Sequence, residues 1–368
     1  MSRPRLAVVG AGVVGLAHAW AGARLGYDVT VFERDAVAAG ASVRNFGLGL
    51  LLGQPQGDLY ELARHSRSLW LELLPAMGCW YKAQGSLVVA RNAVEWAVLE
   101  AFQAELGQQY GTRLLNAAAL SAHDALGLGA LQSGSEIAFE SRQVIPALAG
   151  WLAQMHGVRF HYGTQINAVE LPVLQTSQGR HHADRVIVCT GHDFQTLYPA
   201  HFSALDLARC GLQMLRVVNP GITLGPALMT GLSTLHYGAF TQSAALAEPL
   251  ARLHEQLACE QPELLEHGIH LIIQQVGLDG DLIIGDSHHY GADITPFSSA
   301  AVDTLLLDLA ESLLGRRLQV QARWQGVYAK GPRPYEIMQP EPGVQLVTIT
   351  AGVGMSIALA LAERVLSP

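Results

Sequence analysis

The sequence predicts an α/β protein in which a domain built on a parallel sheet is interleaved with a domain built on an antiparallel sheet. Residues 6–33 read as strand, glycine turn, helix and strand, and residues 184–191 read as another buried strand, ending in Thr-Gly. Residues 208–275 contain several strand-like segments and one long helix, a pattern typical of a covered antiparallel sheet. No flexible linker separates these regions, so we expect one domain from residues 1–80, 135–205 and 280–368, and a second from residues 81–134 and 206–279.

The first stretch, LAVVGAGVVGLAHAWAGARLGYDVTVFE, predicts strands at Leu6–Val9 and Asp28–Phe32 around a helix at Val13–Leu25. Its glycines suit a dinucleotide. Gly10 permits the tight turn, Gly12 lets a pyrophosphate approach the backbone, and Gly15 lets the helix pack closely on the sheet. The helix N-terminus then presents unpaired N–H groups to the phosphates. Glu33 ends the second strand, where a carboxylate can bind both hydroxyls of an adenosine ribose.

Composition argues against several other functions. The net charge is −8 and no cluster of Lys or Arg occurs, so nucleic acid is not an expected partner. The 4 cysteines form no CxxC pair and no Cys/His metal spacing, so we expect free thiols in the reducing cytoplasm. Only Lys82 and Lys330 are lysines, which makes the position of each informative.

Two apolar stretches resemble membrane signals, but each has a better interpretation. Residues 1–26 resemble a secretory signal, although the glycine turn accounts for the apolar run and no cleavage site follows. Gly343–Ala362 is uncharged, but its central Thr and Gly residues favour strand, loop and helix over a membrane span. We therefore expect no membrane association.

Further elements follow from periodicity and turn residues. In the first half we expect helices at Asp58–Leu74, Ala93–Leu106 and Pro146–Met155, strands at Gly85–Ala90, Val158–Tyr162, Gln165–Leu171 and Val173–Ser177, and a glycine-rich loop at Leu126–Glu140. In the second half we expect strands at Leu212–Val218, Gly225–Leu228, Leu235–Ala239, Ile269–Gln275, Leu282–Ile284, Gln319–Gly326 and Val344–Ile349, helices at Leu246–Glu260, Ser298–Leu314 and Ile357–Leu366, and a loop at Val327–Pro342.

The C-terminal segment TAGVGMS, between a predicted strand and a predicted helix, indicates which dinucleotide is bound. It places a second helix N-terminus, with glycines that expose its backbone, far along the chain from the first. A flavin benefits from such a helix because reduction leaves negative charge on its pyrimidine ring.

The chain resembles the FAD-dependent amine and amino-acid oxidases, the family of D-amino-acid oxidase, glycine oxidase and sarcosine oxidase. The resemblance covers essentially the whole length and rests on VVGAGVVGLAHAWAGARLGYDVTVFER, GASVRNFG, VIVCTGHD, GLQMLRV, LIIGDS and TAGVGMSIALALAE. RNFG and WQGVYAKG also resemble a subgroup linked to aminophosphonate breakdown. The family implies a Rossmann-like FAD-binding domain interleaved with an antiparallel-sheet substrate domain, and substrate held between the flavin and that sheet.

The resemblance also implies roles for individual residues. Those expected to bind FAD are Gly10, Gly12, Val14, Gly15, Glu33, Arg34, Ser42, Arg44, Asn45, Val169, Gly191, Gly352, Gly354, Met355 and Ser356. Those expected near substrate are Arg44, Asn45, His236, Tyr237 and Met355, with Tyr328 and Lys330 as catalytic candidates. Lys330 is a candidate for anion binding or oxygen activation, the alternative being a solvated loop lysine.

Three departures from the family pattern concern the cofactor linkage and the substrate anion. Residues 323–342 contain no cysteine, so we expect non-covalent FAD. Tyr328 stands where glycine-oxidase-like members place a carboxylate-binding arginine, and Met355 stands where sarcosine-oxidase-like members place a lysine. A different anion, or an anion bound elsewhere, is therefore expected.

The implied reaction is oxidation of a small primary or secondary amine to an imine, which hydrolyses to an aldehyde or keto acid, while O₂ becomes H₂O₂. The specific hypothesis is 2-aminoethylphosphonate or its N-methyl form, giving phosphonoacetaldehyde. The alternatives are a glycine, sarcosine or D-amino-acid oxidase, a flavin-dependent hydroxylase suggested by Gly285-Asp286-Ser287-His288, and a non-catalytic flavoprotein. His288–His289 lacks a third ligand at suitable spacing, so no metal is expected. The sequence does not indicate an oligomeric state.

Overall fold

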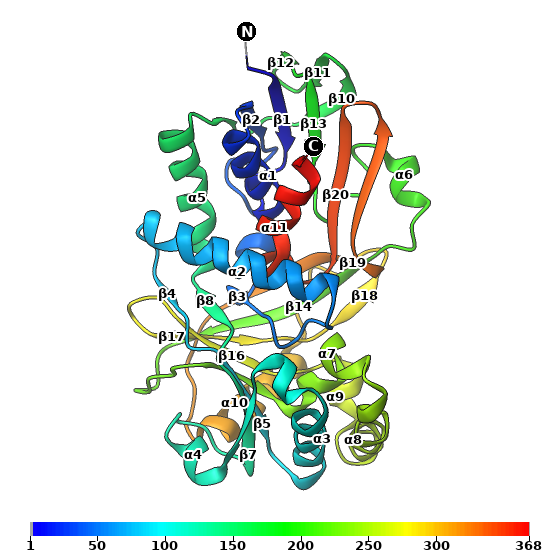
Figure 1. The fold of residues 1–368 in the computed structure, drawn as a ribbon. Coiled ribbons are helices and arrows are strands. Elements are labelled where there is room, and N and C mark those ends of the chain that lie inside the picture. Colours follow the sequence, from blue (N-terminus) through cyan, green and yellow to red (C-terminus); the bar gives the residue numbers. More distant parts are fainter. Residues whose placement is uncertain (1–2, 368) are drawn as a thin grey trace.

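The computed structural model describes residues 3–367, which form two lobes joined by long strands (Figure 1). The upper lobe in this view contains the parallel strands β1 (Arg5–Val9), β2 (Asp28–Phe32), β9 (Arg159–His161), β13 (Arg185–Val188) and β20 (Val344–Ala351). They lie in the order β20-β13-β1-β2-β9, and each neighbouring pair is parallel. This arrangement confirms that residues 184–191 supply a strand beside the first one.

Helices α1 (Val13–Arg24) and α11 (Gly354–Leu366) pack against each other in this lobe, and α2 (Asp58–Ala76) packs on α11. Close packing depends on a small residue in α1. A Cβ atom at Gly22 would lie 2.5 Å from a methyl carbon of Leu6 in β1. Helix α5 (Ser141–His156) also contacts α1. The helices thereby seal the apolar interior of this lobe.

Two small antiparallel sheets flank the parallel strands. One contains β10 (Ile166–Glu170), β11 (Val173–Thr176) and β12 (Gly179–His182). The other has the order β3-β8-β4, with bounds Leu48–Gly49, Ile137–Phe139 and Tyr81–Lys82. A short 3₁₀ helix, η1 (Ala41–Val43), precedes β3, and α6 (Pro199–Ser203) follows β13.

The lower lobe contains mainly antiparallel strands covered by helices. Its strands are β5 (Ser86–Ala90), β6 (Arg113–Asn116), β7 (Gly129–Ser133), β14 (Ala208–Val217), β15 (Ala227–Thr230), β16 (Ile272–Val276), β17 (Asp281–Gly285) and β18 (His289–Gly291). Its helices are α3 (Ala93–Tyr110), α4 (Ala117–Ser121), η2 (Gly231–Leu235), α7 (Gly238–Thr241), η3 (Ala244–Leu246), α8 (Ala247–Glu260), α9 (Pro262–Glu266) and α10 (Ala300–Leu314). The pair of β5 and β15 is parallel.

Strand β19 (Val320–Glu341) joins the lobes, because it pairs with β14 at one end and β20 at the other. One 14-stranded sheet therefore runs through the molecule in the order β6-β7-β5-β15-β16-β17-β14-β19-β20-β13-β1-β2-β9, with β18 on β14. The predicted loop at residues 327–342 is wrong, since residues 327–341 belong to β19. Irregular register between Lys330 and Tyr335 accommodates Pro332 and Pro334, which had suggested a loop.

Three other local predictions were wrong. Residues 126–140 contain the buried strands β7 and β8 instead of only a loop. Residues 235–239, expected as a strand, lie at the end of η2 and the start of α7. Helix α3 continues past Gly107 to Tyr110 and is capped by Gly111, which adopts φ +63°. A left-handed cap, rather than any glycine within the pattern, ends that helix.

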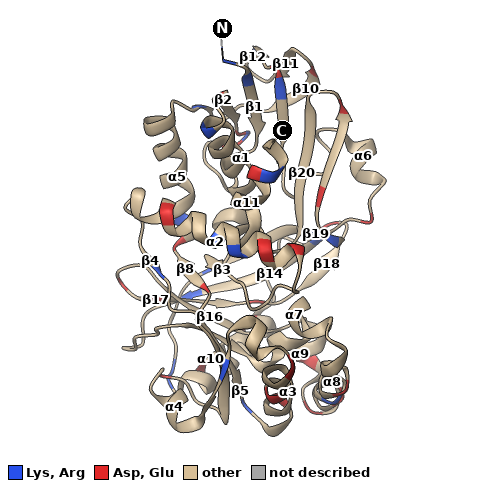
Figure 2. Cartoon of the chain, viewed as in Figure 1, with Lys and Arg blue, Asp and Glu red and all other residues tan. Residues whose placement is uncertain are grey.

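The charges of the upper and lower lobes are interspersed along the elements visible in Figure 2, with acidic and basic residues on the same helices. This agrees with the absence of a basic cluster in the sequence. Within residues 3–367, no helix combines the length and apolar character that a bilayer crossing requires.

Candidate functional site

One elongated cavity extends from the glycine turn after β1 to the antiparallel sheet of the lower lobe. Its wall combines segments that are far apart in sequence: the β1–α1 turn, residues 40–50, the start of β10, the end of β13, and the β20–α11 turn. At the lower-lobe end it is lined by Tyr237, His270, Asp286, His288 and Tyr328. The cavity therefore brings together most of the residues that the sequence predicted to bind a cofactor.

The glycine turn has the backbone that its sequence requires. Gly10 adopts φ +103°, a conformation that side chains disfavour. A Cβ atom at Gly15 would lie 1.9 Å from the carbonyl oxygen of Gly10, so Gly15 controls helix packing rather than lining the cavity. Gly12 precedes α1 without a side-chain cap, and the hydroxyl of Ser42 accepts a hydrogen bond from the N–H of Val13 at 2.8 Å.

The acidic residue at the end of β2 lies on the same wall. Oε2 of Glu33 accepts a hydrogen bond of 2.8 Å from the N–H of Ala11, which ties the end of β2 to the turn. Arg34 beside it forms an ion pair of 2.6 Å with Asp193. Gly191, at φ +63°, also lines the cavity after β13. Val169 pairs with Leu174 in the small sheet, and the cavity wall near it is formed by residues 164–166.

Residues 41–47 form a tight loop over the cavity. The amide nitrogen of Asn45 donates to the carbonyl oxygens of Ala41 and Ser42, and its Oδ1 accepts from the N–H of Gly47. Asn45 therefore holds the loop in shape. Arg44 is exposed and donates a hydrogen bond of 3.3 Å to the carbonyl oxygen of Gln325 in β19.

The β20–α11 turn forms the opposite wall. Gly352 adopts φ +70°, and a Cβ atom there would lie 3.2 Å from Cζ of Tyr328. Helix α11 begins at Gly354 without a side-chain cap. The carbonyl oxygen of Met355 accepts a hydrogen bond from the indole of Trp70 at 2.8 Å, and Oγ of Ser356 accepts one from the N–H of Leu50 at 2.9 Å. These contacts fix the turn.

The face of β19 near this turn presents the two catalytic candidates. Tyr328 pairs with Cys210 of β14, and Lys330 pairs with Ala208 on one side and Ala351 on the other. Burial raises the pKa of the Cys210 thiol to about 11 and raises the pKa of Tyr328 above its ordinary range. Both groups are therefore neutral at physiological pH. Lys330 is partly exposed and lies near enough for its charge to act on His236.

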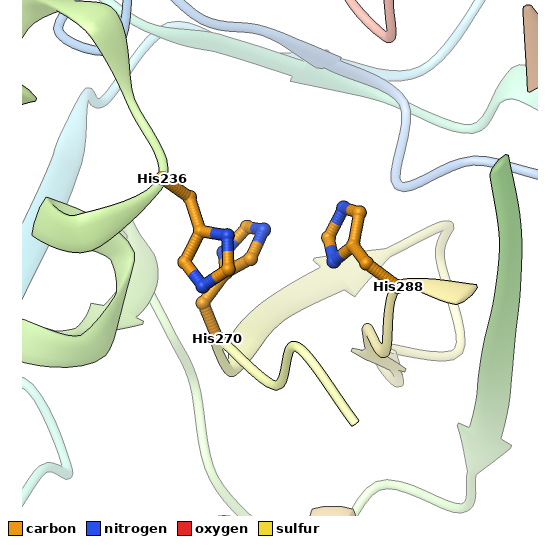
Figure 3. A group of neighbouring side chains, drawn as sticks. All are labelled: His236, His270 and His288. Atoms are coloured by element: carbon orange, nitrogen blue, oxygen red, sulfur yellow. The ribbon is translucent and has the colours of Figure 1, made fainter. Parts of the chain in front are cut away.

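A group of three histidines, which we call the histidine cluster, lies at the lower-lobe end of the cavity (Figure 3). His236 follows η2, His270 precedes β16, and His288 lies between β17 and β18. The rings of His236 and His270 are stacked with centroids 4.4 Å apart, and those of His270 and His288 with centroids 4.9 Å apart. Of these three, only His236 is among the residues that the sequence predicts to lie near substrate.

A buried carboxyl group lies against this cluster. Oδ1 of Asp286 is 3.4 Å from Nε2 of His270, and Oδ2 is 3.9 Å from Nε2 of His288. Burial raises the pKa of Asp286 to about 6, although the charge of His288 opposes that shift. Burial also lowers the pKa of His270 well below its ordinary value, with a further contribution from the two neighbouring histidines.

Two segments of the wall were missed because their residues carry no local signature. His270 and Asp286 belong to strand ends that read as ordinary sheet, and they approach each other only through pairing of β16 with β17. The one available signal was the GDSH sequence at residues 285–288, which we had considered as a hydroxylase motif or as part of a histidine pair.

The wall has features that fit FAD. Helices α1 and α11 both begin at the cavity, and neither N-cap residue caps its helix with its own side chain. Each helix therefore directs a positive dipole end toward the cavity, although the N–H of Val13 in α1 already donates to Ser42. A Cβ atom at Gly12 would lie 3.0 Å from Oγ of Ser42, so the lack of a side chain keeps this backbone exposed at the cavity wall, where a pyrophosphate would lie. Residues 352–356 would hold the electron-rich end of the flavin. A parallel sheet with a glycine turn and a second helix at one cavity defines a dinucleotide-binding flavoprotein.

Comparison with known proteins agrees with this class. The family described as FAD dependent oxidoreductase, DAO, matches residues 5–366, so the chain belongs to that family and is an FAD-dependent oxidoreductase.

Solved structures share the fold at low identity. Glycine oxidase from Bacillus cereus is 17% identical, with a TM-score of 0.77 over 98% of this chain and 93% of that one. Iminodiacetate oxidase from Chelativorans sp. BNC1 is 15% identical, with a TM-score of 0.73 over 99% and 94%. L-α-glycerophosphate oxidase from Mycoplasma pneumoniae with FAD bound is 16% identical, with a TM-score of 0.73 over 99% and 94%.

Proposed function

We propose that this protein oxidises a small amine that carries a phosphonate, with 2-aminoethylphosphonate or its N-methyl form as the substrate. The imine would hydrolyse to phosphonoacetaldehyde and release ammonia or methylamine, and O₂ would be reduced to H₂O₂. The observation that carries this proposal is the set of donors at the lower-lobe end of the cavity. His270 and His288 line the cavity there, and His236 stacks on both of them. Lys330 lies near enough to lower the pKa of His236, and Tyr328 stands in place of the expected arginine.

The cationic groups along the rest of the cavity have other partners. Arg34 is paired with Asp193, and Arg44 contacts the backbone of β19. A carboxylate is commonly bound by two parallel hydrogen bonds from one guanidinium, whereas a phosphonate has three oxygens that separate donors can satisfy. A site that offers a lysine and several histidines in place of one arginine therefore favours a phosphonate over a carboxylate.

FAD, when bound, accepts the two electrons removed from the substrate and passes them to oxygen. The protein contributes orientation and electrostatics. Tyr328 lies beside Gly352 in the β20–α11 turn, and Cys210 pairs with Tyr328. Both side chains stay neutral because burial raises their pKa values, so neither acts as a strong base there. The side chains of Tyr237 and Tyr328 line the lower-lobe end of the cavity, where a small substrate would pack against them.

Anaerobic mixing of the FAD-loaded protein with a panel of amines tests the proposal. We expect the two aminophosphonates to bleach the flavin and, after air is admitted, to yield one H₂O₂ per turnover. Bleaching by glycine, sarcosine or D-alanine alone would refute the phosphonate assignment and favour the second candidate, an amino-acid oxidase. That candidate is supported by the likeness to structures of glycine oxidase and iminodiacetate oxidase.

The hydroxylase alternative receives little support. Asp286 of the GDSH sequence lies in the lower lobe against His270 and His288, rather than beside the glycine turns that would hold the dinucleotide. Consumption of NAD(P)H by the protein would favour a hydroxylase. A protein that binds FAD but is bleached by no amine would instead be non-catalytic.

A further inference from the structure

We propose that His236, His270 and His288, together with Lys330, form the subsite for the anionic group of the substrate and take up a proton when a dianion binds there. This inference rests on the proposed function and names the residues that would recognise the phosphonate. It also predicts a coupling between substrate binding and protonation.

Ring orientation favours an anion over a metal ion. The possible ligand atoms of the three histidines all lie within 4.8 Å of one another. The ring planes, however, are only 18–30° apart in angle. Because nitrogen lone pairs lie in the ring plane, stacked rings keep them in separate, nearly parallel planes, and a single ion cannot lie in all three planes. The N–H bonds lie in the same planes, where different rings can reach different oxygens of an oxyanion.

The local hydrogen bonds favour particular ring orientations. Nδ1 of His288 lies 2.9 Å from the carbonyl oxygen of Gly268, which fixes that nitrogen as a donor to the backbone. Nδ1 of His270 lies 3.3 Å from the hydroxyl of Ser233. His236 is the solvent-accessible member of the cluster. Its ring stacks on those of His270 and His288, so an anion bound by His236 would lie beside the other two rings.

The charge balance explains why a proton should enter with the ligand. Desolvation, with His288 and Lys330 nearby, lowers the pKa of His236 to about 3. Because burial also lowers the pKa of His270, both of these rings are neutral before binding, and a buried carboxyl group, Asp286, lies beside them. A dianion placed here would be repelled by ionised Asp286 and would stabilise protonated imidazole. Protonation of Asp286 removes this repulsion, and protonation of an imidazole adds an attraction. We therefore expect one proton to be taken up with the dianion and shared among these groups.

Other titratable groups face the cluster from every neighbouring element. Tyr237 follows η2, Tyr290 lies on β18, Cys210 on β14, and Tyr328 and Lys330 on β19. Burial raises the pKa of each of the three tyrosines, so they stay neutral hydrogen-bond donors. Lys330 adds an amine to these donors, and a bound dianion would draw the proton to the imidazoles or to Asp286.

Calorimetric titration of the FAD-loaded protein with ethylphosphonate tests this subsite. Ethylphosphonate lacks an amine and cannot be oxidised, and propionate serves as the carboxylate control of similar size. Measurements at one pH in two buffers of different ionisation enthalpy give the number of protons taken up, after the ligand's own protonation is subtracted. We expect about one proton for ethylphosphonate and tighter binding than for propionate.

Variants locate the subsite. His236→Gln should weaken ethylphosphonate binding about tenfold or more and reduce proton uptake, because a charge-assisted hydrogen bond is lost. His270→Asn should do the same. His289→Gln is the matched control, since His289 is adjacent in sequence, exposed and outside the cluster, and it should change neither quantity. Melting temperature and FAD content establish that each variant is folded.

The possible outcomes distinguish failure of the proposed anion subsite from failure of the proposed oxidation reaction. Unchanged binding in His236→Gln and His270→Asn, or binding without proton uptake, would overturn the inference. Binding that disappears with a chelator and returns with zinc would assign the cluster to a metal instead. If ethylphosphonate binds as expected but no aminophosphonate bleaches the flavin, the subsite stands and the proposed reaction fails. If aminophosphonates react equally well in both cluster variants, the reaction stands and the subsite fails.

Discussion

Oδ1 of Asp286 lies 3.4 Å from Nε2 of His270, yet among the described residues it has no hydrogen-bond partner. Both side chains are less than one tenth exposed. A buried carboxyl group without a partner costs folding free energy when it is ionised. The pair is therefore a site at which stability and protonation are linked.

Asp286→Asn should change how stability depends on pH. Burial raises the pKa of Asp286 from 3.8 in the unfolded chain to about 6 in the folded protein, so the folded state holds its proton more tightly. The contribution to stability is complete below the unfolded value and is lost as pH rises through the folded value. The wild type should therefore lose about 1–3 kcal/mol relative to Asp286→Asn between pH 4 and 6.

Urea unfolding of both proteins at pH 4, 5, 6 and 7 measures this difference directly. The lowered pKa values of His236 and His270 act in the opposite direction, and comparing the two proteins at each pH removes the part of that effect that does not depend on Asp286. A difference in unfolding free energy that stays constant over this range would show that Asp286 titrates normally.

Gly15→Ala should destabilise the upper lobe and reduce the FAD content of the purified protein. The added Cβ atom would lie 1.9 Å from the carbonyl oxygen of Gly10, so the start of α1 must move away from the turn. Overpacking of this kind costs about 1–3 kcal/mol. Flavin absorbance per protein and the urea midpoint are the measurements.

Gly150→Ala is the matched control for that change. Gly150 also lies within a helix, α5, but a Cβ atom there would meet nothing within 4 Å. Alanine is favoured over glycine inside a helix by about 1 kcal/mol, so this variant should be as stable as the wild type or slightly more stable. Equal FAD loss in both variants would contradict the steric explanation.

The sequence was most informative where chemistry is local. The strand, glycine turn and helix at residues 5–24 were predicted with nearly correct bounds, because the glycine positions and the apolar strand depend only on their neighbours. Strand β19 was predicted only in part. Its prolines and charged residues resemble a loop, and its strand pairing depends on β14 and β20, which lie on either side of it.

The candidate site was likewise predicted only in those parts that have a local sequence signature. The residues at the two helix N-termini were recognised because glycine turns have a sequence signature. The histidine cluster was not recognised, since its members come from three segments and meet only through tertiary packing. His288 was considered with its sequence neighbour His289, whereas its spatial neighbours are His236 and His270. The division of the chain into two interleaved domains stays a prediction.

The FAD should be released when the protein is denatured with acid. Residues 323–342 contain no cysteine to form a flavin thioether at the family's usual position. We expect all flavin absorbance in the supernatant after acid precipitation, and no fluorescent protein band on a denaturing gel. Flavin that remains with the precipitate would instead direct attention to Cys189, which is buried in the cavity wall.

Lys330→Met should separate the two roles left open for this lysine. The charge of Lys330 contributes to lowering the pKa of His236 and opposes the rise in the pKa of Cys210, which places its ammonium group on the side of the histidine cluster. If Lys330 binds the substrate anion, the apparent Kd in anaerobic flavin reduction rises about tenfold, while reoxidation by O₂ is unchanged. If it activates oxygen, reoxidation slows and the Kd stays the same.

We expect the first result, and Lys330→Arg should restore most of the affinity because it keeps the charge. A slow reoxidation with normal reduction would assign Lys330 to oxygen chemistry and leave the anion to the histidines alone.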